Sequence, residues 1–140
     1  MEGIKVLLVD DEIPFITTLG KRLGKRGFDV VEAHDGEEAL AAMEQREAEV
    51  VILDVKMPGM DGLTALYKIK QQWPMTEVLM LTGHASMEAA IRGMELGAFD
   101  YLLKPIKIDQ LLYKIQDAYK KKSLTDQKIV QKKETFGRAE

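Results

Sequence analysis

Five short apolar runs, each followed by an amphipathic segment of helical length, constrain the fold of this 140-residue chain more than any other feature. The runs are rich in Val, Ile and Leu with little polar alternation, which is typical of strands buried on both faces. They are Ile4–Val9, Val30–Ala33, Val50–Leu53, Val78–Leu81 and Tyr101–Leu103. Crossovers of this length require parallel strands and right-handed connections. The sequence therefore predicts five consecutive βα units.

Residues with helix-capping and helix-breaking character separate these units. The candidate N-caps are Asp35, Asp61, Ser86 and Asp109, because their side-chain oxygens can accept hydrogen bonds from the first free backbone N–H groups of a helix. Gly27 and Gly97 follow the first and fourth helical segments, as C-terminal glycines do. We expect an α/β fold, a flavodoxin-like doubly wound (βα)5 sheet with five parallel strands in the order 2-1-3-4-5.

The composition favours one globular domain. Hydrophobic residues make up 46% of the chain, and there is no cysteine, so neither a disulfide framework nor a thiolate metal site is available. With only His34 and His84, the composition argues against a histidine zinc site. No apolar run is long enough to span a bilayer, and the start of the chain lacks a signal-peptide pattern. We expect a cytoplasmic protein with no membrane contact.

The last twenty residues have a net positive charge, unlike the rest of the chain. Residues 121–140 hold six Lys and Arg against three acidic residues, although the whole chain has a net charge of −3. This basic stretch is sparse and lacks interleaved aromatic residues, so we expect a solvated, partly helical or frayed end rather than a nucleic-acid-binding segment. The predicted organisation is a domain over residues 1–122 and a basic C-terminal tail, or the start of a linker, over 123–140.

Charged residues follow three of the predicted strands. Asp10 and Asp11 come after the first run, Asp54 after the third and Lys104 after the fifth. In a doubly wound sheet the carboxyl ends of the strands form the ligand-binding edge, so we expect these side chains to converge. Three close carboxylates repel one another unless a cation is present, and oxygen-only ligands favour Mg²⁺ over zinc or copper. An ammonium beside them suits a phosphoryl group.

Four motifs in this order resemble the receiver domains of two-component response regulators, along nearly all of residues 3–121. They are Val-Asp-Asp-Glu at 9–12, Asp-Val-Lys-Met-Pro-Gly-Met-Asp-Gly at 54–62, Leu-Thr-Gly-His at 81–84 and Gly-Ala-Phe-Asp-Tyr-Leu-Leu-Lys-Pro at 97–105. The resemblance implies phosphoryl transfer from a histidine kinase, or from a histidine phosphotransfer protein, to an aspartate. By position, Asp54 is the implied acceptor.

The resemblance also assigns roles to the other site residues. It implies that Asp10, Asp11, Asp54 and the main-chain carbonyl of Lys56 hold Mg²⁺. Thr82 matches the switch hydroxyl and Lys104 the phosphate-binding lysine, so the implied catalytic residues are Asp54, Thr82 and Lys104. A carboxylate needs no general base, because it is ionised at neutral pH. The bond between Lys104 and Pro105 is typically cis in the family.

Signalling is expected to follow from a small structural change. Phosphorylation adds about two negative charges, which can draw Thr82 inward and let the Tyr101 ring fill the vacated space. We expect this shift to alter the surface formed by the fourth helix, fifth strand and fifth helix, to which a downstream protein would bind. A phosphorylation-dependent homodimer is a further possibility that the family leaves open.

The best interpretation is a stand-alone receiver that is a phosphoacceptor and not an enzyme. The alternative within the family is an N-terminal receiver cut from a longer transcription factor of the sigma-54 activator type. Outside it stand a Mg²⁺-dependent aspartate-nucleophile phosphatase and a phosphorylation-independent interaction module. The phosphatase usually has an aspartate two residues after the nucleophile, where this chain has Lys56. The interaction module usually lacks the acceptor or the lysine, and both are present.

Overall fold

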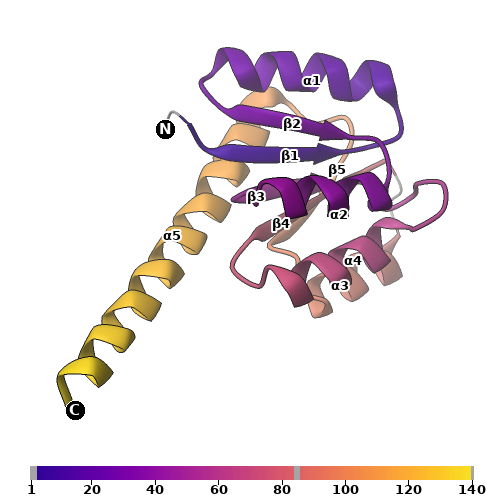
Figure 1. The fold of residues 1–140 in the computed structure, drawn as a ribbon. Helices are drawn as coiled ribbons and strands as arrows, with labels where there is room; N and C mark the ends of the chain where they lie inside the picture. The colour runs from indigo at the N-terminus through magenta and orange to yellow at the C-terminus, as the bar shows by residue number, and fades with distance from the viewer. Residues whose placement is uncertain (1–2, 84–85, 140) are drawn as a thin grey trace.

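The computed structural model describes residues 3–83 and 86–139, in which strands and helices alternate from β1 to α5 (Figure 1). The strands are β1 (Lys5–Val9), β2 (Asp29–Ala33), β3 (Val50–Leu53), β4 (Glu77–Thr82) and β5 (Asp100–Leu103). The helices are α1 (Ile13–Lys25), α2 (Gly36–Gln45), α3 (Gly62–Gln72), α4 (Met87–Glu95) and α5 (Ile108–Ala139). All paired strands are parallel, in the order β2-β1-β3-β4-β5, which confirms the predicted doubly wound topology.

Helices cover both faces of the sheet and create two apolar cores. Alternate residues of β3 separate them: Val51 and Leu53 pack with α2, α3 and α4, whereas Val50 and Ile52 pack with α1 and α5. This division follows from the period of two in a strand, which sends successive side chains to opposite faces. The carboxyl ends of the central strands are thereby fixed between two packed layers.

The outermost strands differ from the prediction that every run is buried on both faces. β1, β3 and β4 are almost fully buried, but Val31 of β2 and Leu103 of β5 are 38% and 48% exposed. The prediction was wrong for these two strands because they are the edges of the sheet. An edge strand has a neighbour on one side only and extends beyond the cover of the helices.

Side-chain caps set the starts of three helices as predicted. Asp35, Asp61 and Ser86 each accept a hydrogen bond from the backbone N–H three residues later, at 2.8, 2.8 and 3.2 Å. The prediction for Asp109 was wrong by two positions, because α5 begins at Ile108, which makes Lys107 the N-cap position, and Asp109 lies in the first turn. The N–H of Leu111 already donates to the carbonyl of Lys107 at 3.1 Å, so the helical hydrogen bonding starts before Asp109.

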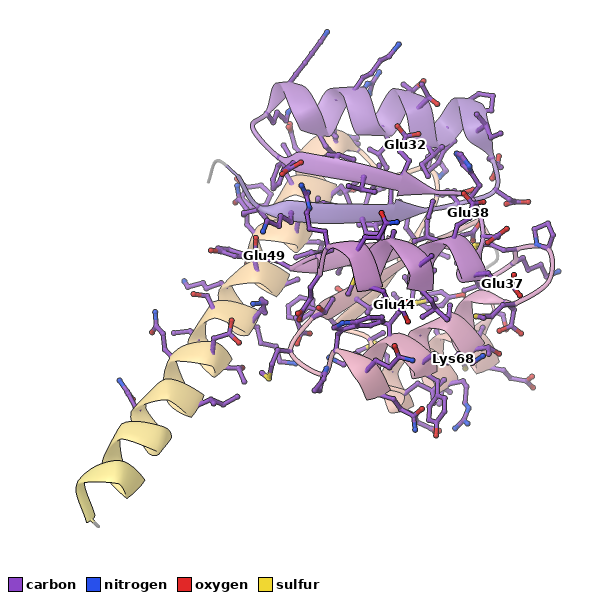
Figure 2. The ribbon with its side chains drawn as sticks, in the orientation of Figure 1. Glu32, Glu37, Glu38, Glu44, Glu49 and Lys68 are labelled. Atoms are coloured by element: carbon purple, nitrogen blue, oxygen red, sulfur yellow. The ribbon has the colours of Figure 1, made fainter. Side chains whose placement is uncertain are left out.

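The second helix is amphipathic and its start contacts the loop that follows β3. Its exposed residues include Glu37, Glu38 and Glu44, which point away from the sheet (Figure 2). Gly36, at its first turn, is buried against Met60, and a Cβ there would lie 2.8 Å from the Met60 sulfur. The glycine therefore lets α2 approach this loop closely, which helps to fix the chain beside the carboxyl end of β3.

Helix α5 runs for 32 residues without a break and passes through the predicted boundary at residue 122. Figure 1 shows its second half extending away from the sheet. Near the point of departure, the ammonium of Lys121 lies 3.4 Å from a carboxylate oxygen of Glu77, a buried residue at the start of β4. Among the described residues, none of the helices combines the length and the apolar composition that a membrane-spanning segment needs.

Candidate functional site

Four of the predicted site residues lie at the carboxyl edge of the sheet. Asp10 follows β1, Asp54 follows β3, Thr82 ends β4 and Lys104 follows β5. Backbone hydrogen bonds extend the sheet as far as these residues: the Asp54 N–H donates to the Val9 carbonyl at 3.0 Å, and the Lys104 N–H to the Thr82 carbonyl at 2.8 Å. The backbone positions at the site are therefore set by strand pairing rather than by flexible loops.

The ammonium of Lys104 lies among three carboxylates. Its Nζ donates to Asp10 Oδ2 at 2.6 Å and to Glu12 Oε1 at 3.0 Å, and it stands 3.6 Å from Asp54 Oδ2. Burial of the ammonium lowers the pKa of Lys104, but the hydrogen bonds from its charged form to Asp10 and Glu12 outweigh burial, so the net pKa is raised. Lys104 is therefore fully charged at neutral pH.

Asp10 is buried and both of its oxygens are hydrogen-bonded. Oδ2 accepts from Lys104 and Oδ1 accepts from the backbone N–H of Glu12 at 2.9 Å. Burial raises the pKa of Asp10 and the nearby charge of Asp54 adds to that effect, while the two hydrogen bonds oppose it; the net pKa is above the usual 3.8. Because burial disfavours the charged form of Asp10, an additional cation nearby would stabilise that charged form.

The carboxylate of Asp54 is buried and held by its own local backbone. Its Oδ1 accepts a hydrogen bond from the N–H of Val55 at 2.7 Å, and the whole residue is 5% exposed. Beneath it, the N–H of Gly62 donates to the Val55 carbonyl at 2.6 Å. A Cβ at Gly62 would lie only 1.9 Å from the Asp54 carbonyl oxygen, so only glycine allows the start of α3 to approach this closely.

The acidic group in the structure differs in one member from the predicted one. Among the described residues, the carboxylate oxygens of Asp10, Glu12 and Asp54 lie within 4.8 Å of one another, a spacing that could hold a metal ion. Asp11 is exposed and outside this group, and Lys56 is an exposed residue of the loop after β3. Sequence analysis missed Glu12, which occupies the N-cap position of α1 but makes no side-chain cap hydrogen bond there.

The two predicted switch residues lie behind the carboxylates. Thr82 is completely buried, and Tyr101 of β5 is partly buried against the core shared with α3 and α4. Burial raises the pKa of the Tyr101 hydroxyl and the charge of Asp54 adds to this rise, so Tyr101 is neutral at physiological pH. The bond between Lys104 and Pro105 is cis, as predicted. His84, in the third motif, lies outside the described residues.

This fold and site define a class of α/β domain whose carboxyl edge combines buried carboxylates with a lysine, a chemistry suited to a cation and a phosphoryl group. The sequence profile of the response regulator receiver domain matches residues 6–116. The chain therefore belongs to the receiver-domain family of response regulators, the aspartate-phosphorylated proteins of two-component signal transduction.

Relatives of known identity support this assignment. The DNA-binding transcriptional regulator NtrC of Salmonella typhimurium is 38% identical over 113 residues, which cover 81% of this chain and 24% of NtrC. PhoP of Bacillus subtilis, an alkaline phosphatase synthesis transcriptional regulatory protein, is 42% identical over 72% of this chain and 42% of its own. This chain thus spans about a quarter of NtrC and less than half of PhoP.

Solved receiver domains have the same fold. A CheY-like response regulator receiver domain protein from Methanospirillum hungatei superimposes with a TM-score of 0.85 at 28% identity, covering 89% of this chain and 99% of that one. The receiver domain of NtrX from Brucella abortus gives a TM-score of 0.78 at 35% identity over 82% of this chain and 98% of its own. The match extends over nearly the whole of each solved domain.

Proposed function

We propose that Asp54 accepts the phosphoryl group and that Lys104 and Thr82 assist the transfer. One observation carries this assignment: at the carboxyl end of the central strand, the buried Asp54 carboxylate lies within ion-pair distance of the Lys104 ammonium, which also contacts a second buried carboxylate, Asp10. The hydrogen bond to Val55 fixes one oxygen of Asp54. The other oxygen faces Lys104 at 3.6 Å, where an incoming phosphoryl oxygen could share the ammonium.

The proposed reaction moves one phosphoryl group between two side chains. A carboxylate oxygen of Asp54 forms a bond to phosphorus while the bond from phosphorus to a phosphohistidine nitrogen breaks, and the released imidazole takes up a proton. The negative charge on the three equatorial oxygens needs compensation. Lys104 supplies a positive charge and Thr82 a hydroxyl donor. We propose that the chain acts as a phosphoacceptor and not as a turnover enzyme.

We further propose that Asp10, Asp11, Asp54 and the carbonyl of Lys56 hold Mg²⁺. Two of these residues, Asp10 and Asp54, belong to the described carboxylate group whose oxygens lie within 4.8 Å of one another, and the pKa of Asp10 is raised by burial, so they fit this ion. Bound there, Mg²⁺ would neutralise charge between the acceptor and the phosphoryl oxygens. Glu12 belongs to the same group, and its carboxylate would compensate the charge of Lys104 while the ion compensates Asp10.

The signal is proposed to leave the domain through α4, β5 and α5. Exposed apolar side chains lie on these elements: Met87, Ile91, Met94, Leu103 and Tyr113. Tyr101, which packs beneath α4, is proposed to couple them to Thr82. A histidine kinase or phosphotransfer protein would be the donor, and a downstream protein or a second copy the partner of this face. The output could belong to a separate protein or to further domains, as in the longer relatives.

The test uses acetyl phosphate with Mg²⁺ and intact-mass spectrometry. The wild-type protein should gain the mass of one phosphoryl group, and Asp54→Ala should gain none. Asp61→Ala is the matched control, because Asp61 is an exposed N-cap on the neighbouring helix and should leave phosphorylation intact. Labelling that persists in Asp54→Ala would place the acceptor elsewhere. Repeating the reaction with a purified phosphohistidine donor would test the proposed source of the phosphoryl group.

A further inference from the structure

Among the described residues of the site, the Lys104 ammonium lies over the aromatic ring of Phe15. The Nζ of Lys104 lies 4.2 Å from the centroid of the Phe15 ring, on the first turns of α1. The Lys104 side chain is 13% exposed, so the contact is largely shielded from water. The same ammonium contacts three carboxylates, so Phe15 adds an uncharged contact to three charged ones.

The face of an aromatic ring attracts a cation because it carries the negative part of the ring quadrupole. This attraction acts over the whole face within about 6 Å of the centroid and has no single preferred partner atom. Hydrogen bonds to Asp10 and Glu12, by contrast, fix the ammonium at 2.6 and 3.0 Å from particular oxygens. The ring therefore attracts the ammonium without fixing it to a particular atom.

Phosphoryl transfer to Asp54 requires the Lys104 ammonium to move toward Asp54. In the unphosphorylated structure the Lys104 ammonium is bonded to Asp10 and Glu12 and stands farther from Asp54. To stabilise a phosphoryl group on Asp54, it must shift from Asp10 and Glu12 toward the new oxygens. An aliphatic side chain at position 15 would fill the same space but would attract the ammonium much less.

We propose that Phe15 is a positioning residue for phosphoryl transfer, acting as a cation–π platform on which Lys104 moves from Asp10 and Glu12 toward the phosphoryl group. The proposal rests on the function proposed for Asp54 and Lys104. It adds a determinant of reaction rate that lies outside the charged and hydroxyl-bearing residues of the site. Phe15 does not touch the reacting atoms and acts only through Lys104.

The surroundings of Phe15 allow the ring to be altered without a general disruption. The ring is only partly buried, and it borders an open apolar groove of about 390 Å³ between α1 and the start of α5, lined also by Thr18, Arg22 and Ile108. Because one side of the ring faces this groove, small substituents have room there. Phenylalanines with one, two or three fluorine atoms can therefore weaken the negative ring face at nearly constant shape.

The experiment measures the rate of Asp54 phosphorylation by acetyl phosphate in Phe15→Leu, Phe15→Tyr and a series with fluorinated phenylalanine placed at position 15. We expect Phe15→Leu to react about threefold to tenfold more slowly, as the usual strength of a partly buried cation–π contact implies. Phe15→Tyr should restore most of the rate, and the fluorinated series should slow stepwise with each fluorine. In a Lys104→Met background, Phe15→Leu should have no further effect.

A spectroscopic signature checks the contact itself. In wild type, ring current should shift the side-chain CH₂ protons next to Lys104 Nζ upfield, and this shift should disappear in Phe15→Leu. Two results would overturn the role of Phe15 while leaving Asp54 phosphorylation in place. One is an equal rate for every member of the fluorinated series. The other is a Phe15→Leu substitution that slows the Lys104→Met variant as much as it slows the wild type. A wild-type protein that takes up no phosphoryl group would overturn the proposed function and the positioning role together. Because the fluorinated series preserves packing, it tests the positioning role of Phe15 even if Phe15→Leu folds poorly.

Discussion

Lys104 donates its shortest hydrogen bond to Asp10, at 2.6 Å, and stands at 3.6 Å from Asp54. The lysine thus pairs more closely with Asp10 than with Asp54, the expected acceptor. Both carboxylates are buried, so the single ammonium cannot fully compensate the two of them. A cation near Asp10 would release Lys104 toward Asp54, which links metal binding to the readiness of the acceptor.

Removing this ammonium should slow phosphorylation without abolishing it. Lys104→Met keeps most of the side-chain length but loses the charge, so we expect phosphorylation of Asp54 by acetyl phosphate to slow on the order of a hundredfold, as when a donor to a developing anion is removed. Lys107→Met is the matched control, because Lys107 is an exposed lysine three residues away. Intact-mass spectrometry over time gives both rates, and equal rates would remove Lys104 from the mechanism.

Replacing Thr82 should separate acceptance of the phosphoryl group from the structural response. Thr82→Ala should still be phosphorylated on Asp54, more slowly, because the carboxylate and Lys104 remain. The response to beryllofluoride, a mimic of the aspartyl phosphate, should be smaller around Tyr101 and Ile91 than in wild type, because the coupling hydroxyl is gone. NMR chemical-shift changes measure this directly. Spectra that change equally in both proteins would refute the coupling route through Thr82.

The close approach at Gly62 should make this position intolerant of any side chain. Gly62→Ala would place a methyl group 1.9 Å from the Asp54 carbonyl oxygen. Since backbone would have to move, we expect a loss of about 3 kcal/mol or more in the free energy of unfolding. Gly24→Ala is the control, because a Cβ at this α1 glycine meets nothing within 4 Å and should change stability by at most about 1 kcal/mol. Urea denaturation measures both.

A surface ion pair should give the domain a defined acid sensitivity. Arg46, at the end of α2, hydrogen-bonds Asp29 of β2 at 2.9 Å and holds the pKa of that carboxyl below its usual 3.8. A lowered carboxyl pKa stabilises the folded state above pH 3.8, and this contribution is lost as the pH falls through the folded pKa. Asp29→Asn should therefore unfold at lower urea than wild type at pH 7, with a difference that shrinks in acid.

The control for this pair is Arg46→Gln, which should show the same pH dependence, while the double variant should add little to either single one. The effect is small because both side chains are substantially exposed. A difference between Asp29→Asn and wild type that stayed constant from pH 7 into the acid range would mean that the carboxylate charge does not cause it.

Residues that act through local rules could be predicted from the sequence. The central strands were recognisable because burial on both faces demands continuous apolar runs, and Asp35, Asp61 and Ser86 because capping involves a backbone N–H only three residues away. The convergence of Asp10, Asp54 and Lys104 followed from the parallel topology. Once five βα units are accepted, the ends of the strands share one edge.

Contacts set by three-dimensional packing could not be predicted. Glu12 has the sequence context of an exposed residue at a helix start, and its bond to Lys104 joins positions 92 residues apart. Phe15 fits an ordinary amphipathic stripe, and nothing in its spacing indicates an ammonium above the ring. The extent of α5 was also hidden, because beyond residue 122 the apolar periodicity weakens and the charged residues resemble a solvated tail.

Because α5 is long, a small tilt of the helix where it leaves the sheet displaces its far end by several ångströms. At about 1.5 Å per residue, its 32 residues extend about 48 Å, and the stretch after Lys121 accounts for more than half of this. The contact of Lys121 with the buried Glu77 lies where the helix leaves the sheet. A tilt of only about 10° at that point would displace the far end by roughly 5 Å, as far as one helical turn rises. About the same point, the arm toward the start of α5 is about 20 Å long, so this tilt would move that end by roughly 3.5 Å, and the tip moves about 1.4 times as far as the start of the helix.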